Sequence, residues 1–248
     1  MLSQEEEWLL EEKYIGEKSE AFFADCQKLK AGVPLAYLIG HIPFLNTRIY
    51  LDSKPLIPRP ETEYWVEKSI TEIKKRTETS KDVRILDLCA GSGCIGVAVL
   101  KNCSDLTLDF IELDKKHRTT IEKNCLTNEL NSERYKILIG DLFSPLTDEK
   151  YDFILSNPPY IDPLLDRAEK SVKDNEPEIA LYGGKKGMEI IEEIINKASK
   201  YLKPEGQLWL EHEPEQVEII KEIADYEFSI ITHRDQYAVQ RFSQLVLK

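Results

Sequence analysis

The segment Asn157-Pro158-Pro159-Tyr160 holds the residue types best suited to chemistry in this chain. The Asn157 side chain offers one acceptor oxygen, and the Pro158 carbonyl is a second acceptor that the rigid backbone holds in one direction. Two acceptors side by side can grip an –NH2 group by both hydrogens, while Tyr160 covers the flat face of the molecule that carries it. A strand that merely stops at an Asn-Pro turn would share part of this pattern, but Asn-Pro-Pro-Tyr after an apolar strand is much rarer. The segment therefore predicts a site for an amino or amide nitrogen.

A glycine-rich turn upstream predicts a cofactor site. Gly91 and Gly93 let the backbone approach a ligand, and Gly96 allows a helix to pack closely on a strand. Gly-x-Gly-x-x-Gly alone fits a dinucleotide equally well, but Asp87 would repel a pyrophosphate at the helix N-terminus and attract a cationic amino-acid headgroup. The pattern Asp-x-x-x-Gly-x-Gly therefore favours S-adenosylmethionine. The cofactor-binding residues predicted in this turn are Asp87, Cys89, Ala90, Gly91, Ser92 and Gly93.

Acidic residues follow two further apolar runs. Glu112 ends one of them about 20 residues beyond the glycines, where a carboxylate accepts hydrogen bonds from ribose hydroxyls. Asp114 fits better as the N-cap of a helix that begins at Lys115. Asp141 can accept a hydrogen bond from an adenine amino group while Leu142 packs on the ring, although a solvated turn acid has the same appearance.

These residues need a sheet that brings the ends of its strands together. Short apolar runs at 83–88, 106–111, 135–139 and 151–156 predict buried strands. Strands alternate with helical segments from residue 83 to residue 248, the pattern of a doubly wound α/β sheet, in which ligands bind at the carboxyl edge. The later predicted elements are a helix at 188–202, a strand at 207–211, a helix at 214–224 and two closing strands near 227–232 and 241–247, which suggest an antiparallel final pair.

The first 82 residues have a different character. Residues 1–32 predict one or two short amphipathic helices whose packing anchors are Trp8, Leu9, Phe22 and Phe23. Residues 33–82 are expected to contain a hairpin at 44–50, a helix at 62–73 and a polar linker at 74–82. Glu61 and Glu63 lie at the start of that helix. Their negative charges would interact favourably with the helix dipole there, and a position beside the cofactor is about equally supported.

Composition narrows the class of protein. The net charge is -12 and the pI is near 5.0, which disfavours a protein that grips duplex DNA and suits a basic protein partner. Five cysteines without a C-x-x-C pair predict free thiols, a reducing cytoplasm and no metal site. The acidic N-terminus is unlike a targeting peptide, and no apolar run approaches the ~20 residues of a membrane span. The four scattered histidines are expected at the surface or in packing roles.

Taken together, these motifs resemble the amino methyltransferases. Segments 34–40 (Pro-Leu-Ala-Tyr-Leu-Ile-Gly) and 56–63 (Leu-Ile-Pro-Arg-Pro-Glu-Thr-Glu) resemble one family in particular, the peptide-chain release factor glutamine methyltransferases (HemK/PrmC). Asn175-Glu176-Pro177, Ala180-Leu181 and Gly187-Met188 fit the same family. Its members usually carry a helical domain of several helices before the first segment, and here about 32 residues precede it.

The resemblance implies a class I methyltransferase (Rossmann-like) fold: a seven-stranded sheet with a short helical N-terminal segment and a β-hairpin linker. It divides the chain into a substrate-docking segment (1–32), hairpin and linker (33–82) and a methyltransferase domain (83–248). It implies methylation of N5 of the glutamine in the Gly-Gly-Gln motif of class 1 release factors, by a monomer without direct nucleic-acid contact. Asn157 and Pro158 would be catalytic, and Pro159 and Tyr160 would join them in binding the substrate. Asn157 would also contact the cofactor.

Two other functions fit parts of the pattern. An adenine-N6 methyltransferase acting on DNA or RNA would present the same –NH2 group after base flipping, with the base stacked on Tyr160. The acidic charge, the lack of an evident recognition domain and the segment 58–63 weigh against it. A non-catalytic cofactor-binding scaffold is the other alternative, and the intact segment 157–160 weighs against that.

Overall fold

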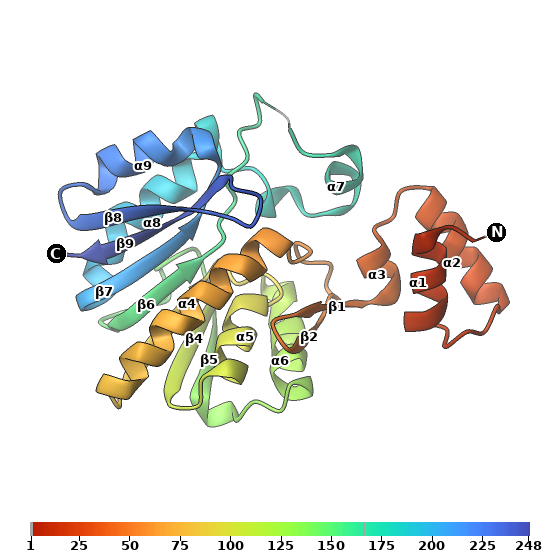
Figure 1. Cartoon of the computed structure of the whole chain (residues 1–248), viewed down its shortest axis with the longest axis horizontal. Coiled ribbons are helices and arrows are strands. Elements are labelled where there is room, and N and C mark those ends of the chain that lie inside the picture. Colours follow the sequence, from red (N-terminus) through yellow and green to blue (C-terminus); the bar gives the residue numbers. More distant parts are fainter. Residues whose placement is uncertain (1, 166) are drawn as a thin grey trace.

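A seven-stranded sheet forms the frame of the molecule in the computed structural model, which describes residues 2–165 and 167–248 (Figure 1). The strand order is β5-β4-β3-β6-β7-β9-β8. The first five of these strands pair in parallel, and β9 pairs antiparallel with both β7 and β8. The strands are β3 (Val83–Leu88), β4 (Leu106–Glu112), β5 (Tyr135–Ile139), β6 (Tyr151–Ser156), β7 (Leu202–Glu211), β8 (Phe228–Arg234) and β9 (Gln240–Leu247). The predicted α/β sheet and its antiparallel final pair are confirmed.

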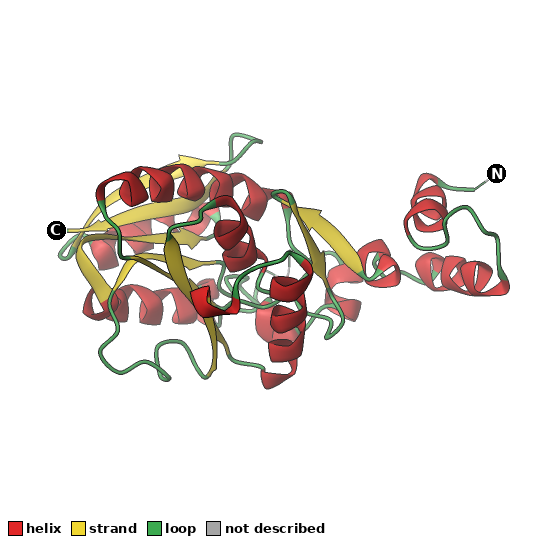
Figure 2. Ribbon diagram, turned by 90° about the horizontal axis from the view of Figure 1, so that it is seen from below, coloured by secondary structure: helices red, strands yellow, loops and turns green. Residues whose placement is uncertain are grey.

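Helices cover both faces of the sheet, as Figure 2 shows. Successive residues of a strand point to opposite faces of the sheet, so both faces are apolar. Ile85 and Trp209 belong to one buried cluster, and their neighbours Leu86 and Leu208 belong to the other. On the first face lie α4 (Pro60–Thr79), α5 (Cys94–Asn102) and α6 (Arg118–Thr127), and on the second α8 (Glu189–Tyr201) and α9 (Val217–Ala224). Each face thus has its own hydrophobic core.

Two predicted boundaries were wrong by five residues or more. The polar linker at 74–82 is largely helix, since α4 continues to Thr79 beyond Ile73, its last fully buried residue. Lys, Arg and Glu are good helix formers, so a polar stretch can extend an exposed helix. Strand β7 begins at Leu202, five residues earlier than predicted, because the Pro204 to Gly206 stretch is accommodated as an irregularity opposite β6.

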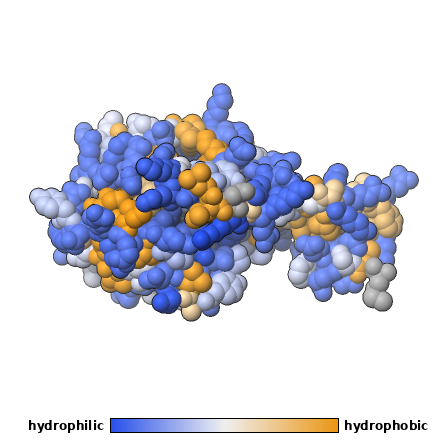
Figure 3. Space-filling model, turned by 90° about the horizontal axis from the view of Figure 1, so that it is seen from above, coloured by the Kyte–Doolittle hydropathy of each residue, from blue (hydrophilic) through white to orange (hydrophobic). Residues whose placement is uncertain are grey.

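The N-terminal helices form a small lobe beside the main body, visible at the right of Figures 1 and 3. They are α1 (Gln4–Glu12), α2 (Glu20–Lys30) and α3 (Leu35–Ile39). Leu9, Phe22 and Leu38 meet in their core. Two predicted packing anchors were wrong, because Trp8 is 50% exposed and Phe23 is 51% exposed. A cluster of three short helices has too little volume to cover both faces of each helix.

The hairpin predicted at 44–50 begins earlier in the structure, where β1 (His41–Phe44) pairs antiparallel with β2 (Thr47–Tyr50). Two buried amides, one in α6 and one at its C-cap, hold the edge of the hairpin as a neighbouring strand would. Asn124 Oδ1 accepts from Tyr50 N at 2.7 Å and its Nδ2 donates to Tyr50 O at 3.0 Å, and Asn128 makes the same pair of bonds to Arg48 at 3.1 and 2.9 Å. The hairpin is therefore fixed to the sheet domain, and the chain after it is directed across the carboxyl edge.

The segment between β6 and α8 also crosses this edge. It contains α7 (Lys170–Asn175) and the 3₁₀ turns Glu178–Ala180 and Lys185–Gly187; the other 3₁₀ turns are Lys115–His117, Ser132–Arg134 and Pro214–Gln216. The buried Glu176 carboxylate accepts from Ile57 N at 2.9 Å and Arg59 Nη2 at 2.6 Å. Because the Glu176 carboxylate is buried, removing its partners would leave an uncompensated buried charge, so this contact locks segment 57–59 to the α7 segment. No helix in the described part of the chain is long and apolar enough to span a membrane.

Candidate active site

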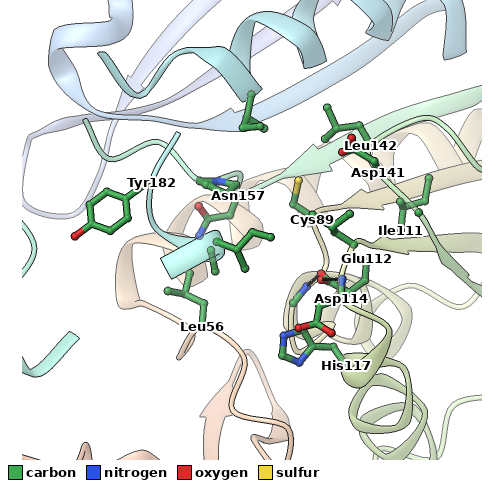
Figure 4. A pocket seen from close by; sticks show the side chains of 17 residues that line it. Leu56, Cys89, Ile111, Glu112, Asp114, His117, Asp141, Leu142, Asn157 and Tyr182 are labelled. Atoms are coloured by element: carbon green, nitrogen blue, oxygen red, sulfur yellow. Dashed lines mark hydrogen bonds between the residues drawn. The ribbon is translucent and has the colours of Figure 1, made fainter. Parts of the chain in front are cut away.

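The main cavity lies at the carboxyl edge of the parallel strands (Figure 4). Loops after four successive strands contribute to it, which is the geometry that a doubly wound sheet provides for a ligand. Seven of the predicted site residues line it: Cys89, Gly91, Glu112, Asp141, Leu142, Asn157 and Pro159. Leu56, Ile111, Asp114, His117 and Ile190 complete much of the remaining wall.

The rest of the predicted glycine turn lies beneath this wall. Ala90 and Ser92 are buried, and Gly93, in left-handed conformation with φ 78°, begins α5. Asp87 is fully buried, and its Oδ2 accepts from Gly96 N at 2.9 Å. Its other oxygen, Oδ1, has no hydrogen-bond partner within residues 2–165 and 167–248. Burial raises the pKa of Asp87 to about 7.

Glu112 organises the floor of the cavity. Its Oε2 accepts from Gly91 N at 2.7 Å, and its Oε1 accepts from Asp114 N at 2.8 Å. Burial raises the pKa of Glu112, and these two backbone donors oppose that shift. Each oxygen keeps a second lone pair for a ligand. Asp114 caps the following turn through Lys116 N at 3.0 Å, which confirms the predicted N-cap, although it also lines the cavity.

Two residues of the wall have strained backbones. Cys89 has φ 64° and Leu142 has φ 43°, although neither is glycine. A left-handed conformation costs an L-residue about 1–2 kcal/mol, and such residues concentrate at functional sites. The backbone at both positions is thus held by its surroundings in a shape that residue type alone does not predict.

Asn157 stands where the main cavity meets a second, smaller hollow, the acceptor pocket. The acceptor pocket is lined by Leu56, Arg59, Asn157, Pro158, Tyr160, Ile161, Ala168, Val172, Ala180 and Leu181. Residues Pro158 and Tyr160 of the predicted substrate site therefore face this second pocket, while Pro159 faces the main cavity. One amide side chain borders both spaces.

A buried hydrogen-bond network supports Asn157 from behind. Asn157 Nδ2 donates to Thr62 Oγ1 at 3.1 Å, and Thr62 Oγ1 donates to Glu211 Oε2 at 2.7 Å. Glu211 also accepts from Trp65 Nε1 at 2.6 Å and Tyr160 OH at 2.9 Å. Burial raises the pKa of Glu211, and its three donors oppose that shift. Neither Thr62 nor Glu211 was predicted as a site residue from the sequence, although an acid at the end of a strand was a usable signal.

The loop that carries Asn157 is clamped by the glycines after α7. A Cβ on Gly183 would lie 2.4 Å from Pro159 O, and one on Gly187 would lie 1.8 Å from Tyr160 O. Gln216 Nε2 donates to the same Tyr160 oxygen at 2.8 Å. The close approach of the two chains therefore requires glycine at both positions.

Other charged or basic residues divide between packing and the cavity wall. His212 is fully buried, with Nε2 2.8 Å from Ser243 Oγ, which confirms a packing role. His117 Nδ1 shares a hydrogen bond with Ser53 Oγ at 2.7 Å, and His117 also lines the main cavity, which the sequence did not indicate. Glu63 accepts from Leu45 N at 2.8 Å, and neither Glu61 nor Glu63 lines the main cavity. Among the residues that the structure describes, no cluster of His, Cys, Asp and Glu could hold a metal ion.

Comparison with known proteins gives consistent results. The family described as "Methyltransferase small domain" matches residues 70–173. A release factor glutamine methyltransferase from Thermodesulfovibrio yellowstonii is 35% identical over 192 residues, 77% of this chain and 67% of that protein. The same enzyme from Streptococcus pneumoniae is 32% identical over 241 residues, 94% of this chain and 82% of that protein. The solved catalytic domain of hMettl16 shares the fold with a TM-score of 0.61 and 18% identity, covering 82% of this chain and 76% of that one.

The sheet order, the antiparallel final pair and the cavity at the carboxyl edge define a class I methyltransferase, the class that takes its methyl group from S-adenosylmethionine. Identity at this level over most of both chains also assigns the family. The chain belongs to the release factor glutamine methyltransferase family.

Proposed function

We propose that this enzyme transfers a methyl group from S-adenosylmethionine to the side-chain amide nitrogen (N5) of the glutamine in the Gly-Gly-Gln motif of class 1 release factors. The position of Asn157 carries the proposal, since it borders both the main cavity and the acceptor pocket. Its Nδ2 is engaged by Thr62, and no donor from residues 2–165 and 167–248 reaches its Oδ1. That oxygen is available to accept a hydrogen bond from an –NH2 group.

The main cavity fits the proposed cofactor. The Glu112 lone pairs suit ribose hydroxyls, and Asp141 with Leu142 suits the amino edge and the face of an adenine. The unpaired Asp87 Oδ1 behind the turn is a buried acceptor that a cationic amino-acid headgroup would compensate. Backbone groups of Cys89, Ala90, Gly91, Ser92 and Gly93 would complete this end of the site. When bound, S-adenosylmethionine supplies a methyl group on a sulfonium, which is an excellent leaving group.

The residues around Asn157 position the acceptor rather than remove its proton. A carboxamide nitrogen is a poor nucleophile because its lone pair is delocalised into the carbonyl. Asn157 Oδ1 and the Pro158 carbonyl would hold the two amide hydrogens, with Pro159 and Tyr160 packing around the group. Alignment of this kind can lower the barrier by ~7–11 kcal/mol. The same two acceptors stabilise the positive charge that develops on the nitrogen.

The proposed partner is a release factor without direct contact to nucleic acid. The net charge of -12 suits a basic protein surface. The α1–α3 lobe, with half-exposed Trp8 and Phe23, would serve as the docking segment. We further propose that the enzyme acts as a monomer in the cytoplasm, where its five unpaired cysteines would stay reduced.

Substitution of Asn157 tests the proposed acceptor site. Asn157→Ala should leave S-adenosylmethionine affinity nearly unchanged and abolish turnover of the release factor. Asn157→Asp should fail as well, because the Thr62 hydroxyl hydrogen is committed to Glu211 and a carboxylate cannot donate to Thr62. Full turnover by Asn157→Ala would remove Asn157 from the mechanism. Methylation of adenine in DNA by the wild type, with none of the release factor, would favour the adenine-N6 alternative.

A further inference from the structure

The network behind Asn157 has a defined direction of donation. As a carboxylate, Glu211 can only accept hydrogen bonds, and Trp65 Nε1 can only donate. The Thr62 hydroxyl has a single hydrogen, which it donates to Glu211 Oε2 at 2.7 Å. Thr62 Oγ1 can therefore only accept from Asn157, which must present Nδ2 at 3.1 Å. The chemistry of the buried acid thus decides which way the Asn157 amide faces.

We propose that Thr62 and Glu211 are positioning residues for methyl transfer. They hold the Asn157 amide with Nδ2 toward Thr62 and Oδ1 toward the substrate group that receives the methyl. The effect of this orientation on turnover rests on the proposed function, since only a substrate that carries an –NH2 group needs Asn157 Oδ1 to face it. A flipped amide would direct its own –NH2 group at the acceptor, and two donors would then face each other. The chain of hydrogen bonds from Asn157 through Thr62 to Glu211 is called the relay below. The relay also selects a substrate with an amide or amino group against one that presents an oxygen acceptor.

Rigid elements hold the members of this relay. Thr62 lies in the first turn of α4, behind Pro60 at the start of the helix, and Trp65 follows one turn later on the same face. Thr62 is 1% exposed, and its branched side chain has few rotamers. Glu211 ends β7, next to the end of β6 from which Asn157 follows. The relay therefore joins α4, β7 and the 157–160 loop, and it assigns a role to Thr62 of segment 56–63.

The decisive experiment compares Thr62→Val with Thr62→Ser. Valine keeps the shape of threonine but can neither accept from Asn157 nor donate to Glu211, whereas serine keeps the hydroxyl. We expect Thr62→Val to lower kcat roughly ten- to a hundredfold, as for one unsatisfied buried polar group. KM for S-adenosylmethionine should change little. Thr62→Ser should restore kcat to within about threefold of the wild type.

A second readout follows the amide without any substrate. In protein labelled with ¹⁵N, the Asn157 side-chain NH2 signals are identified by their loss in Asn157→Ala. Thr62→Val should shift one of the two proton signals upfield and accelerate its exchange with water, because Nδ2 has lost its acceptor. Thr62→Ser should leave both signals close to their wild-type positions. Unchanged amide signals in a folded Thr62→Val variant would overturn the relay.

Glu211→Gln separates positioning from proton transfer. The Gln oxygen must face Trp65 and Thr62, while its nitrogen can donate to the Tyr160 hydroxyl oxygen, so the direction of the relay is preserved. We expect this variant to keep kcat within about tenfold of the wild type, with an unchanged pH profile. Loss of turnover as complete as in Asn157→Ala would instead make Glu211 a proton acceptor and contradict the proposal.

The outcomes keep the two proposals apart. If the wild type methylates no release factor, the proposed function fails, yet the amide signals still decide whether the relay exists. If the wild type methylates the factor and Thr62→Val turns over normally, the relay alone fails. A Thr62→Ser variant as slow as Thr62→Val would also reject it, because the retained hydroxyl would then fail to restore turnover.

Discussion

Gly187→Ala should separate the packing of the 157–160 loop from cofactor binding. Gly187 has φ +68°, and a Cβ there would lie 1.8 Å from Tyr160 O and 2.5 Å from Gln216 Nε2. Gly40 is a matched control, because its φ is +92° but a Cβ would meet nothing within 4 Å. The left-handed conformation alone costs about 1–2 kcal/mol in either variant. In Gly187→Ala the loop must also move away from Gln216, and the broken hydrogen bond leaves the partly buried Tyr160 carbonyl without this donor at a further cost of about 1–3 kcal/mol.

Chemical denaturation should therefore show Gly187→Ala destabilised by about 2–5 kcal/mol and Gly40→Ala by only about 1–2 kcal/mol. Because a displacement of about 1 Å can reduce turnover 10²-fold, kcat should fall far more in Gly187→Ala than in the control. Affinity for S-adenosylmethionine should remain, since Glu112 lies across the cavity from Asn157 of this loop (Figure 4). Equal stability and equal kcat in the two variants would refute the clamp.

Two further predictions concern the cofactor end of the cavity. Glu112→Ala should weaken S-adenosylmethionine binding by about 1.5–3 kcal/mol, because it removes the predicted ribose acceptors. Glu112→Gln, which keeps one acceptor oxygen, should lose less, and unchanged affinity of a folded Glu112→Ala variant in calorimetry would reject the ribose assignment. The raised pKa of Asp87, about 7, means that the group is protonated in the free enzyme below that pH. A bound cation favours the carboxylate, so affinity should rise with pH through about 7 and binding should release a proton; Asp87→Asn should lose both effects. In the free enzyme this raised pKa lowers the unfolding free energy as pH rises from about 4 to about 7, and Asp87→Asn should flatten that slope.

Much of the sheet could be predicted from the sequence, because a buried parallel strand is a short apolar run and its end is marked by polar or glycine residues. The runs at 83–88, 135–139 and 151–156 match β3, β5 and β6 in both bounds. The end of α4 could not be predicted in this way, since Lys, Arg and Glu suit an exposed helix as well as a linker. The start of β7 was mispredicted for a related reason, because Pro and Gly suggest a strand end but are tolerated where a strand bulges.

The candidate site divides along similar lines. Residues that follow strands, such as Glu112 and Asn157, could be placed at the carboxyl edge from sequence alone because the topology brings strand ends together. The pairing of Thr62 with Glu211 could not, because it joins side chains 149 residues apart through the packing of α4 on the sheet. The depth of Asp87 below the cavity wall and the left-handed backbone of Cys89 also depend on how the turn is held.

The proposed function stands or falls with the atom that receives the methyl group. The most direct measurement incubates the enzyme with S-adenosylmethionine labelled in its methyl group, a purified class 1 release factor free of ribosome and RNA, and adenine-containing DNA in the same reaction. Mass spectrometry of the digested products then locates the label. We expect one added methyl on N5 of the Gly-Gly-Gln glutamine, and none when that glutamine is replaced by alanine. Label in adenine with an unmodified release factor would contradict the proposed function.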